Sequence, residues 1–205
     1  MTQDWTGNKK STYGQLAASN HSDNTRQTHD LYCTHPEALR TFLDAYVRRD
    51  GNTLSKKVWE NASGLFHLVN ELKKQGYNVT ASDAWDYGTG ATIKDFLEDS
   101  PLEDMTGVDI LSNPPYKYCN VWTRRGLEVL EPGQRMFLLV KIQYLETLAR
   151  REIFDSEPPK FVYIYSKRQL CAMNGNFENY ASSAVCYAWV VFEKGWQGDT
   201  VVKWI

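Results

Sequence analysis

The sequence predicts an α/β fold with a doubly wound, mostly parallel sheet. From about residue 31 onward, short apolar runs typical of strands alternate with segments of helical periodicity. Two of the apolar runs end in residues that suit a ligand site, Asp83 after one and Asn113 after the other. The last run, residues 184–192, is apolar on both faces, so we expect it inside the sheet rather than at its edge.

The expected elements follow from apolar spacing and from the positions of proline and glycine. Pro36 opens a helix that extends to about Arg49, because proline is favoured in a first helical turn. A second helix runs from Leu65 to an exit at Gly76. Further helices are predicted at 92–98, 118–130 and 142–154. Strands are predicted at 58–60, 77–82, 108–111, 136–140, 161–165 and 184–192.

The chain divides into a polar amino-terminal arm and one domain. Residues 1–30 are polar and lack periodicity, which predicts a flexible arm that orders, if at all, on a substrate or on the rest of the fold. Residues 31–205 contain no internal repeat, linker or low-complexity tract, and they are long enough for one sizeable core. We therefore expect a single domain over 31–205.

Composition and charge restrict the function classes. The formal net charge of -2 provides no global cationic field of the kind found in many nucleic-acid binders, although it is compatible with a local basic groove. The four cysteines lack CxxC spacing, which fits neither a zinc site nor a disulfide framework and indicates a reducing compartment. No metal site is expected. No stretch has the pattern of a signal peptide or a membrane span, so we expect a cytoplasmic protein without membrane association.

The most informative motif is Asn113-Pro114-Pro115-Tyr116, which directly follows the apolar run 108–111. Proline cannot donate to a sheet ladder and fixes its own φ, so the turn is rigid and ends the strand. The Asn113 side-chain oxygen and the Pro114 carbonyl can both accept N–H bonds, while Tyr116 offers a face for stacking. The motif therefore suits a planar amino group. The alternative is a Pro-Pro turn in which Asn113 is an ordinary turn residue.

Three further features suit a nucleoside cofactor. The turn 60–64 contains small residues that let the backbone approach a ligand, and Gly64 permits a tight turn into the next helix. Asp83 ends the next strand about 20 residues later, where a carboxylate binds ribose hydroxyls in doubly wound folds. Asp95 and Phe96 can supply an acceptor for an adenine amino group and an aromatic ring beside it. Taken singly, these features equally fit a plain connection, a capping aspartate and an amphipathic helical turn.

In this order, the segments 60–64, 83, 95–97 and 113–116 resemble motifs I to IV of the gamma-type DNA N6-adenine methyltransferases, which use S-adenosylmethionine (SAM). Upstream, residues 32–36 (Tyr-Cys-Thr-His-Pro) resemble their motif X. Residues 187–195 resemble the closing strand of small phage-associated members. The resemblance covers most of the chain beyond residue 30. It implies a Rossmann-like class I SAM-dependent methyltransferase domain with an antiparallel carboxy-terminal strand.

The resemblance implies a role for each matching residue. The cofactor-binding set that it implies is Tyr32, Thr34, Glu60, Ala62 and Gly64 at the methionine end of SAM, Asp83 at the ribose, and Asp95 with Phe96 at the adenine. The set that would receive the target base is Asn113, Pro114, Pro115 and Tyr116.

The chain departs from the family pattern within motif I. The position of the family's second glycine is Phe66, whose ring would either crowd the methionine moiety or lie on the helix face. The position of the proline after the glutamate is Asn61.

The implied activity is transfer of a methyl group from SAM to the exocyclic N6 amine of adenine in DNA, with the base flipped out or single-stranded. The chain has no room for a large separate target-recognition domain, so recognition is expected from loops 117–120 and 173–180, from the amino-terminal arm or from a partner subunit. Three alternatives share the motif: methylation of guanine N2 in RNA, methylation of glutamine in proteins, and a catalytically inactive relative that binds SAM or nucleic acid.

Overall fold

The computed structural model describes residues 31–173, 175, 177 and 185–205. The predicted arm, 1–30, and part of the predicted recognition loop 173–180 lie outside the described residues. The strands are β1 (Tyr32–Thr34), β2 (Lys57–Glu60), β3 (Asn78–Asp83), β4 (Thr92–Ile93), β5 (Val108–Ser112), β6 (Arg135–Lys141), β7 (Phe161–Ile164), β8 (Cys171–Met173), β9 (Tyr187–Glu193) and β10 (Val201–Trp204). The α-helices are α2 (Pro36–Leu43), α3 (His67–Lys74), α4 (Cys119–Val129) and α5 (Leu148–Ser156). A π-helix, η2 (Asp44–Arg49), continues α2, and two 3-10 turns are η3 (Tyr116–Tyr118) and η4 (Ile142–Leu145).

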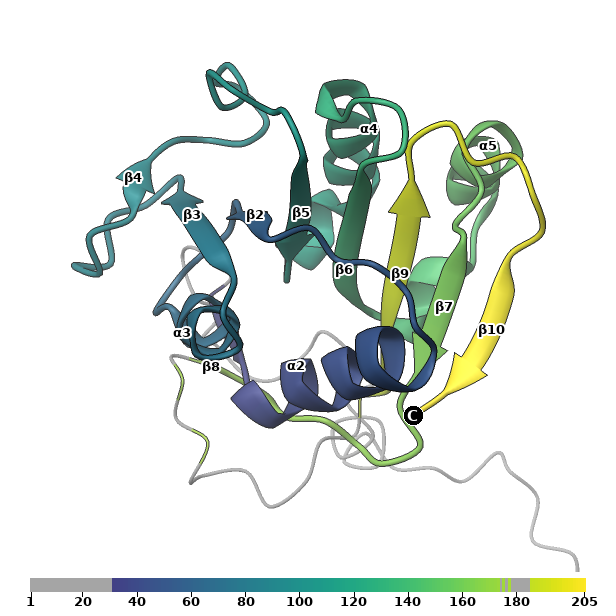
Figure 1. Ribbon diagram of the computed structural model, residues 1–205, viewed down its shortest axis with the longest axis horizontal. Coiled ribbons are helices and arrows are strands. Elements are labelled where there is room, and N and C mark those ends of the chain that lie inside the picture. Colours follow the sequence, from purple (N-terminus) through teal and green to yellow (C-terminus); the bar gives the residue numbers. More distant parts are fainter. Residues whose placement is uncertain (1–30, 174, 176, 178–184) are drawn as a thin grey trace, which may run out of the picture.

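The main sheet has eight strands in the order β10-β7-β9-β6-β5-β2-β3-β4 (Figure 1). β9 runs antiparallel to both of its neighbours, β6 and β7, and the other described pairs in this sheet are parallel. The predicted mostly parallel sheet is thus confirmed, including its antiparallel strand near the carboxyl end. The interior position predicted for 184–192 is confirmed as well, because β9 lies between two other strands.

The sheet carries an apolar core on each face. Successive residues of a strand point to opposite faces, so Leu111 packs in the cluster that contains α2 and α3, while Ile110 packs in the cluster that contains α4. On the first face, the ring of Phe42 in α2 stacks on Trp189 in β9 with centroids 4.8 Å apart. On the second face, a Cβ on Gly126 of α4 would overlap the sulfur of a β6 methionine. Helices therefore cover both faces of the sheet, as the predicted doubly wound fold requires (Figure 1).

The strand order creates a crevice beside β2. β2 pairs with β3 on one side and with β5 on the other, and all three strands are parallel. The helix that follows β2 lies on one face of the sheet and the helix that follows β5 lies on the other. The two connections therefore diverge at the carboxyl ends of β2 and β5, which is where ligands bind in open α/β sheets.

The prediction of a helix at 92–98 is wrong. Thr92 and Ile93 form β4, which pairs with the end of β3, and the following residues form turns. Asp95 Oδ1 accepts the backbone N–H of Leu97 at 2.8 Å, and Asp99 Oδ2 accepts the N–H of Asp95 at 2.7 Å. Aspartate side chains thus compete with carbonyl groups for the N–H groups that a helix would use.

The predicted helix at 142–154 is divided in two. The chain is extended at Glu146 and has a φ of 92° at Thr147, so η4 ends before α5 begins. The guanidinium of Arg150 donates to the carbonyl oxygens of Gln143 and Glu146 at 2.6 and 3.3 Å, which satisfies acceptors at the break. The other predicted helices and strands are present with boundary shifts of a few residues, although Leu65 precedes α3 and is partly exposed. Strands β1, β8 and β10 were not predicted.

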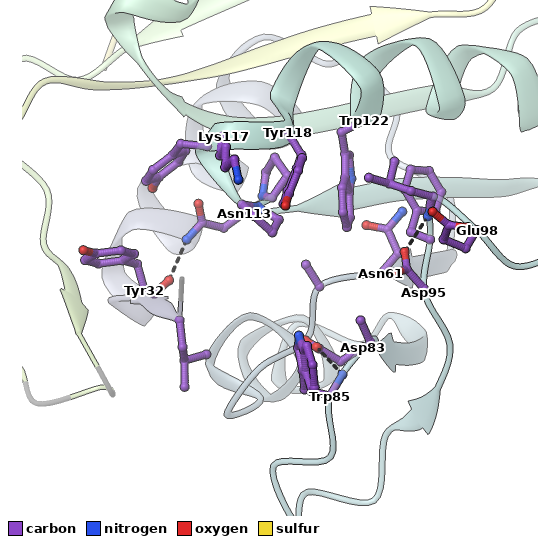
Figure 2. Close-up of a pocket in the computed structure, with 18 of the residues that line it drawn as sticks. Tyr32, Asn61, Asp83, Trp85, Asp95, Glu98, Asn113, Lys117, Tyr118 and Trp122 are labelled. Atoms are coloured by element: carbon purple, nitrogen blue, oxygen red, sulfur yellow. Dashed lines mark hydrogen bonds between the residues drawn. The ribbon is translucent and has the colours of Figure 1, made fainter. Parts of the chain in front are cut away.

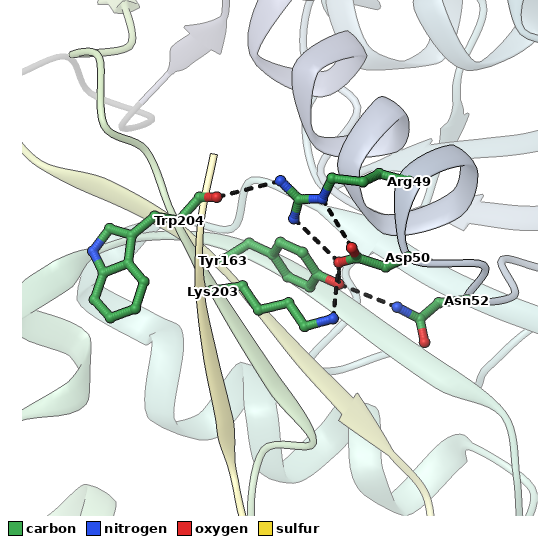
Figure 3. Close-up of polar contacts among 6 residues, drawn as sticks. All are labelled: Arg49, Asp50, Asn52, Tyr163, Lys203 and Trp204. Atoms are coloured by element: carbon green, nitrogen blue, oxygen red, sulfur yellow. Dashed lines mark hydrogen bonds and ion pairs between the residues drawn. The ribbon is translucent and has the colours of Figure 1, made fainter.

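A polar cluster near the β10 edge of the sheet connects the end of η2 to the strands β7 and β10 (Figure 3). The Asp50 carboxylate accepts hydrogen bonds from Arg49 at 2.8 Å, from the hydroxyl of Tyr163 at 2.6 Å and from Lys203 Nζ at 2.9 Å. Asn52 Nδ2 donates to the same tyrosine hydroxyl at 3.1 Å. These partners, Arg49 first, hold the pKa of Asp50 well below its usual range.

We predict that Asp50→Asn lowers the free energy of unfolding by about 1.5–3 kcal/mol at pH 7, since it weakens hydrogen bonds to a charged group. Because the pKa of Asp50 is depressed in the native state, this contribution is present above the unfolded pKa and is lost as the pH falls. Urea unfolding at pH 7 and pH 3 measures both effects.

The matched control is Asp44→Asn, which removes an exposed ion pair with Arg48 on the same helical segment. Its expected effect is below about 0.5 kcal/mol. Equal stabilities of Asp50→Asn and wild type at pH 7 would contradict a stabilising role for the cluster.

Candidate functional site

A cavity of about 680 Å³ lies at the carboxyl ends of β2, β3 and β5 (Figure 2). It extends from Asp83 and Asp95 to Asn113. A small side pocket of about 30 Å³ adjoins it around Glu60 and Gly64 and shares part of its lining. The crevice that the strand order creates is therefore not filled by side chains, and it forms a cavity.

All the site residues predicted from the sequence line one of these two volumes. The main cavity is lined by Tyr32, Ala62, Asp83, Asp95, Phe96, Asn113, Pro114, Pro115 and Tyr116. The side pocket is lined by Thr34, Glu60 and Gly64, together with Tyr32, Ala62 and Asn113. The fold thus brings together groups that the sequence separates widely.

The Asn113 side chain is held by its amide nitrogen. Nδ2 donates to the backbone carbonyl of Tyr32 at 2.8 Å (Figure 2). A carbonyl only accepts hydrogen bonds, so the amide cannot be reversed without losing this contact. Oδ1 is buried and has no hydrogen-bond partner among the described residues. Asn113 therefore contributes a fixed acceptor where the main cavity meets the side pocket.

The ring of Tyr116 has a cation and a second ring near it. Lys141 Nζ lies 4.9 Å from its centroid, and the ring of Tyr32 is stacked with it at 6.5 Å and an interplanar angle of 30°. Tyr32 and Tyr116 both line the main cavity. Burial raises the pKa of Tyr116 well above its usual value, with Cys171 and Tyr187 close to its hydroxyl.

Asp83 connects the loops that follow β2 and β3. Its carboxylate accepts the backbone N–H of Gly64 at 2.9 Å and that of Trp85 at 3.0 Å. Gly64 has a φ of 45°, and a Cβ there would lie 2.8 Å from the side chain of Leu31. The backbone conformation therefore favours glycine at this position, and a larger residue would also displace the Leu31 side chain. Burial raises the pKa of Asp83, although the backbone hydrogen bonds oppose this effect. Three backbone N–H groups, including that of Ala84, approach this carboxylate, which leaves acceptor capacity for a ligand hydroxyl.

Glu60 is fully buried at the end of β2. Its Oε1 accepts the N–H of Ala62 at 3.1 Å and the hydroxyl of Ser112 at 2.7 Å, whereas Oε2 has no partner among the described residues. Burial raises the pKa of Glu60 to about 8, and the nearby charge of Asp83 acts in the same direction. A cationic group placed beside Oε2 would favour the ionised form of this carboxyl group.

Phe66, at the position where the resembled motif I has glycine, has a backbone conformation that glycine favours. Its φ and ψ are 65° and 18°, in the left-handed region that glycine favours. Its ring lies near α3, where Lys73 Nζ is 5.8 Å from the ring centroid. Phe66 lines neither the main cavity nor the side pocket. Of the two alternatives for this residue, the structure has the ring on the helix side.

The opposite end of the cavity is formed by residues 95–98 and by α4. Asp95 uses Oδ1 to accept the N–H of Leu97. Phe96 is 2% exposed and packs against Trp59 at 5.3 Å and against Trp122 at 4.7 Å between ring centroids. Phe96 and Trp122 therefore form an apolar floor beside the Asp95 carboxylate.

Several cavity residues have no role predicted from the sequence. They are Leu31, Asn61, Ala84, Trp85, Tyr87, Leu97, Glu98 and Trp122. Lys117 and Tyr118, which also line the cavity, belong to the predicted recognition loop 117–120. Trp85 is 51% exposed and comes two residues after Asp83, so a large aromatic in a polar loop was an available signal. The periodicity of α4 predicted that Trp122 is buried, but it did not indicate that the ring lines a cavity.

Among the described residues, no group of three or more His, Cys, Asp or Glu side chains is arranged to hold a metal ion. Within the same part of the chain, no helix combines the length and apolarity needed to span a membrane.

No protein-family model matches the chain, and a search of curated proteins gives no match. Solved structures do match. A candidate class I SAM-dependent methyltransferase from Listeria monocytogenes has a TM-score of 0.58 and 13% identity, covering 95% of this chain and 72% of that one. A candidate RNA methyltransferase from Pyrococcus horikoshii also has a TM-score of 0.58 and 13% identity, covering 90% and 97%. A chain from a type I R-M system has a TM-score of 0.51 and 13% identity, covering 81% of this chain and 44% of that one.

These similarities concern the fold. The chain has the mixed α/β architecture of Rossmann-like class I methyltransferases, with a mostly parallel sheet and an antiparallel strand near its carboxyl end. At such low identity, the reaction has to be argued from the cavity itself.

We predict that Glu60→Gln stabilises the protein at pH 8 and leaves stability unchanged near pH 4.5. The raised pKa of Glu60 means that between about pH 4.5 and 8 the unfolded chain loses a proton that the native state keeps. Wild-type stability therefore falls as the pH rises through this window. The variant lacks this dependence and should exceed wild type by more than about 1 kcal/mol at pH 8.

The control is Glu71→Gln, for which the expected change in stability at pH 8 has the opposite sign. Glu71 pairs with Arg40 at 3.1 Å, and that hydrogen bond lowers its pKa, so this variant should be less stable than wild type at pH 8. Chemical unfolding at both pH values measures each difference. A wild type as stable as Glu60→Gln at pH 8 would refute the buried protonated carboxyl group.

Proposed function

We propose that this chain is a SAM-dependent methyltransferase that acts on the exocyclic N6 amine of adenine in DNA. The observation that carries the proposal is the Asn113 amide, whose orientation is fixed by the Tyr32 carbonyl and whose Oδ1 is left without a partner. It borders a cavity that continues to Asp83 and Asp95. The fold that the chain shares with class I methyltransferases supports the same reading.

The residues around the cavity fit SAM. Its volume of about 680 Å³ lies in the range of about 300–1,000 Å³ that small-molecule sites occupy. SAM carries a sulfonium, an ammonium and a carboxylate, so its net charge is positive and acidic surroundings favour it. Glu60 Oε2, buried and unpartnered, suits the ammonium group, and Asp83 suits the ribose hydroxyls. Asp95 and Phe96 border the space left for the adenine.

The residues that line the side pocket would make the remaining contacts with the cofactor. Tyr32 and Thr34 of β1, with Ala62 and Gly64 of the turn after β2, would surround the methionine part. When bound, SAM supplies a methyl group on a positively charged sulfur. This chain's own task is then to hold the acceptor amine in line with that group, which is where most of the rate enhancement arises.

Asn113 and Pro114 suit this task. The amine of adenine has two N–H groups, and its lone pair is delocalised into the ring. Asn113 Oδ1 and the Pro114 carbonyl can accept one N–H each, which draws the nitrogen toward tetrahedral geometry and turns its lone pair to the methyl group. The same two oxygens stabilise the positive charge that develops on the nitrogen. Pro115 keeps this turn rigid.

The aromatic rings favour a flat substrate. The rings of Tyr32 and Tyr116 are stacked with centroids 6.5 Å apart. Both rings line the cavity, so a planar base beside them can stack on a tyrosine face. A glutamine side chain gains far less from stacking, which supports a nucleobase over a protein substrate. Base stacking of this kind contributes about 1–3 kcal/mol per base.

The mouth of the cavity supplies further contacts for a nucleic acid. Trp85 and Tyr118 are 51% and 44% exposed and can stack on neighbouring bases, while Lys117 can contact a phosphate. A chain of a type I R-M system and a candidate RNA methyltransferase both share the fold, so the choice of DNA rests on the resemblance of residues 113–116 to the adenine methyltransferases. We further propose that target sequence is recognised by the loop 117–120 or by a partner subunit, because the cavity itself accommodates little more than one base and the cofactor.

We predict that Asn113→Ala reduces methyl transfer at least about 10²–10³-fold, because it removes one of two acceptors for the developing charge. SAM affinity should be unchanged. Labelled methyl transfer to unmethylated DNA, followed by nucleoside analysis, measures the first effect, and calorimetry measures the second. Asn70→Ala, at an exposed position on α3, is the matched control.

The nucleoside product decides between the polymers. N6-methyldeoxyadenosine is expected, whereas methylguanosine from RNA or methylglutamine from protein would replace the proposed substrate. SAM binding without transfer to any of the three would indicate an inactive relative, and wild-type activity in Asn113→Ala would remove the assigned role of this residue.

A further inference from the structure

Asn61 has an unusual environment for a polar side chain. It follows β2 directly, is 1% exposed, and lines the main cavity. In Figure 2 its amide is drawn beside Trp122 and Asp95. Neither Oδ1 nor Nδ2 has a hydrogen-bond partner among the described residues. Buried amides are paired in the great majority of cases, so a side chain with both polar atoms unused requires an explanation.

The fold makes no use of this amide. The side chains of Asn52 and Asn113 each donate a hydrogen bond that links two segments of the chain, whereas the side chain of Asn61 forms no hydrogen bond with a described residue. Leaving a buried donor and acceptor unpaired lowers the stability of the chain. A ligand in the cavity would supply the missing partners.

The surroundings of Asn61 define the chemistry of that ligand. The apolar floor of Phe96 and Trp122 suits a flat aromatic ring, and Asp95 provides a carboxylate at the edge of that ring. Trp122 Nε1 is a second buried donor without a described partner. An amide pairs with an exocyclic amine and an adjacent ring nitrogen through one acceptor and one donor, which is how asparagine recognises adenine in nucleic acids.

We propose that Asn61 recognises the adenine ring of the cofactor, with Oδ1 accepting from the exocyclic amine and Nδ2 donating to N7. This inference rests on the proposed function, because it takes SAM as the ligand. It assigns a specificity-determining role to a position where the family pattern has proline, which cannot make such contacts. A purine with a carbonyl in place of the amine is disfavoured, because its carbonyl and N7 are both acceptors and the amide can meet only one of them with a donor, whichever way it is turned.

The test compares wild type with Asn61→Leu, which has a similar size and no polar atom. Calorimetry gives the affinities for S-adenosylhomocysteine and for S-inosylhomocysteine, in which the amine is replaced by a carbonyl. Wild type should bind the adenosyl compound at least about 10-fold more tightly than the inosyl compound. In Asn61→Leu, affinity for the adenosyl compound should fall about 10-fold or more, and the ratio between the two compounds should shrink.

Thermal unfolding of the ligand-free protein separates binding from structure. Because the amide is unpartnered, Asn61→Leu should have a Tm equal to or above that of wild type. Asn61→Ala, which adds no bulk, should lose affinity to the same extent. Asn70→Leu, at an exposed position of α3, should leave affinity and the ratio unchanged.

The outcomes distinguish the two proposals. Failure of wild type to bind either compound would overturn the proposed function. Tight binding by wild type with an unchanged affinity or an unchanged ratio in both Asn61 variants would overturn the role of Asn61 alone. A Tm that falls in both variants would overturn it as well, because it would show that the amide serves the fold.

Discussion

The position of β2 between β3 and β5 is the constraint on which the site depends. Since all three strands are parallel, their carboxyl ends meet at one edge of the sheet. The helix that follows β2 (α3) and the helix that follows β5 (α4) lie on opposite faces of the sheet. The chain therefore leaves an opening at this edge. Glu60, Asp83 and Asn113 each stand at or just beyond the end of one of these strands. A different strand order would have placed the same residues farther apart along this edge.

Among the described residues, most buried polar side-chain atoms without a hydrogen-bond partner belong to residues that line the cavity or its side pocket. Glu60 Oε2, both amide atoms of Asn61 and Asn113 Oδ1 are buried without described partners. Each such group lowers stability by about 1–3 kcal/mol. At the far end of the sheet, by contrast, the Asp50 carboxylate is surrounded by donors. The difference indicates that the cavity is organised to bind a ligand, and that ligand binding should raise the stability of the whole chain.

The sequence predicted the doubly wound sheet and most of its helices because apolar periodicity is a local property. It missed β1, β8 and β10, since two of these strands have only three residues and the third lies half-exposed at the sheet edge. It placed a helix at 92–98, where aspartate side chains take the backbone N–H groups. In each case the missing information lay in contacts with distant residues or in turn chemistry.

The candidate site was predicted in part. The chemistry of Asn113 can be inferred from its motif, but its orientation depends on the backbone carbonyl of Tyr32, 81 positions away, and a backbone carbonyl has no sequence signature. The backbone conformation of Phe66 could not be predicted either, because the sequence does not show whether a phenylalanine has a left-handed or a right-handed helical φ. Asn61 stood out in the sequence only as a missing proline. Its unpartnered state emerges only when the neighbours that bury it are known.

We propose above that one cavity orients SAM with its reactive sulfur toward Asn113. A crystal structure with S-adenosylhomocysteine would show whether it does. We expect the amino group of the ligand about 3 Å from Glu60 Oε2, the adenine at the Asp95 end, and the sulfur facing Asn113. A nucleoside bound between Tyr32 and Tyr116 in the reverse orientation, or bound outside the cavity, would contradict it.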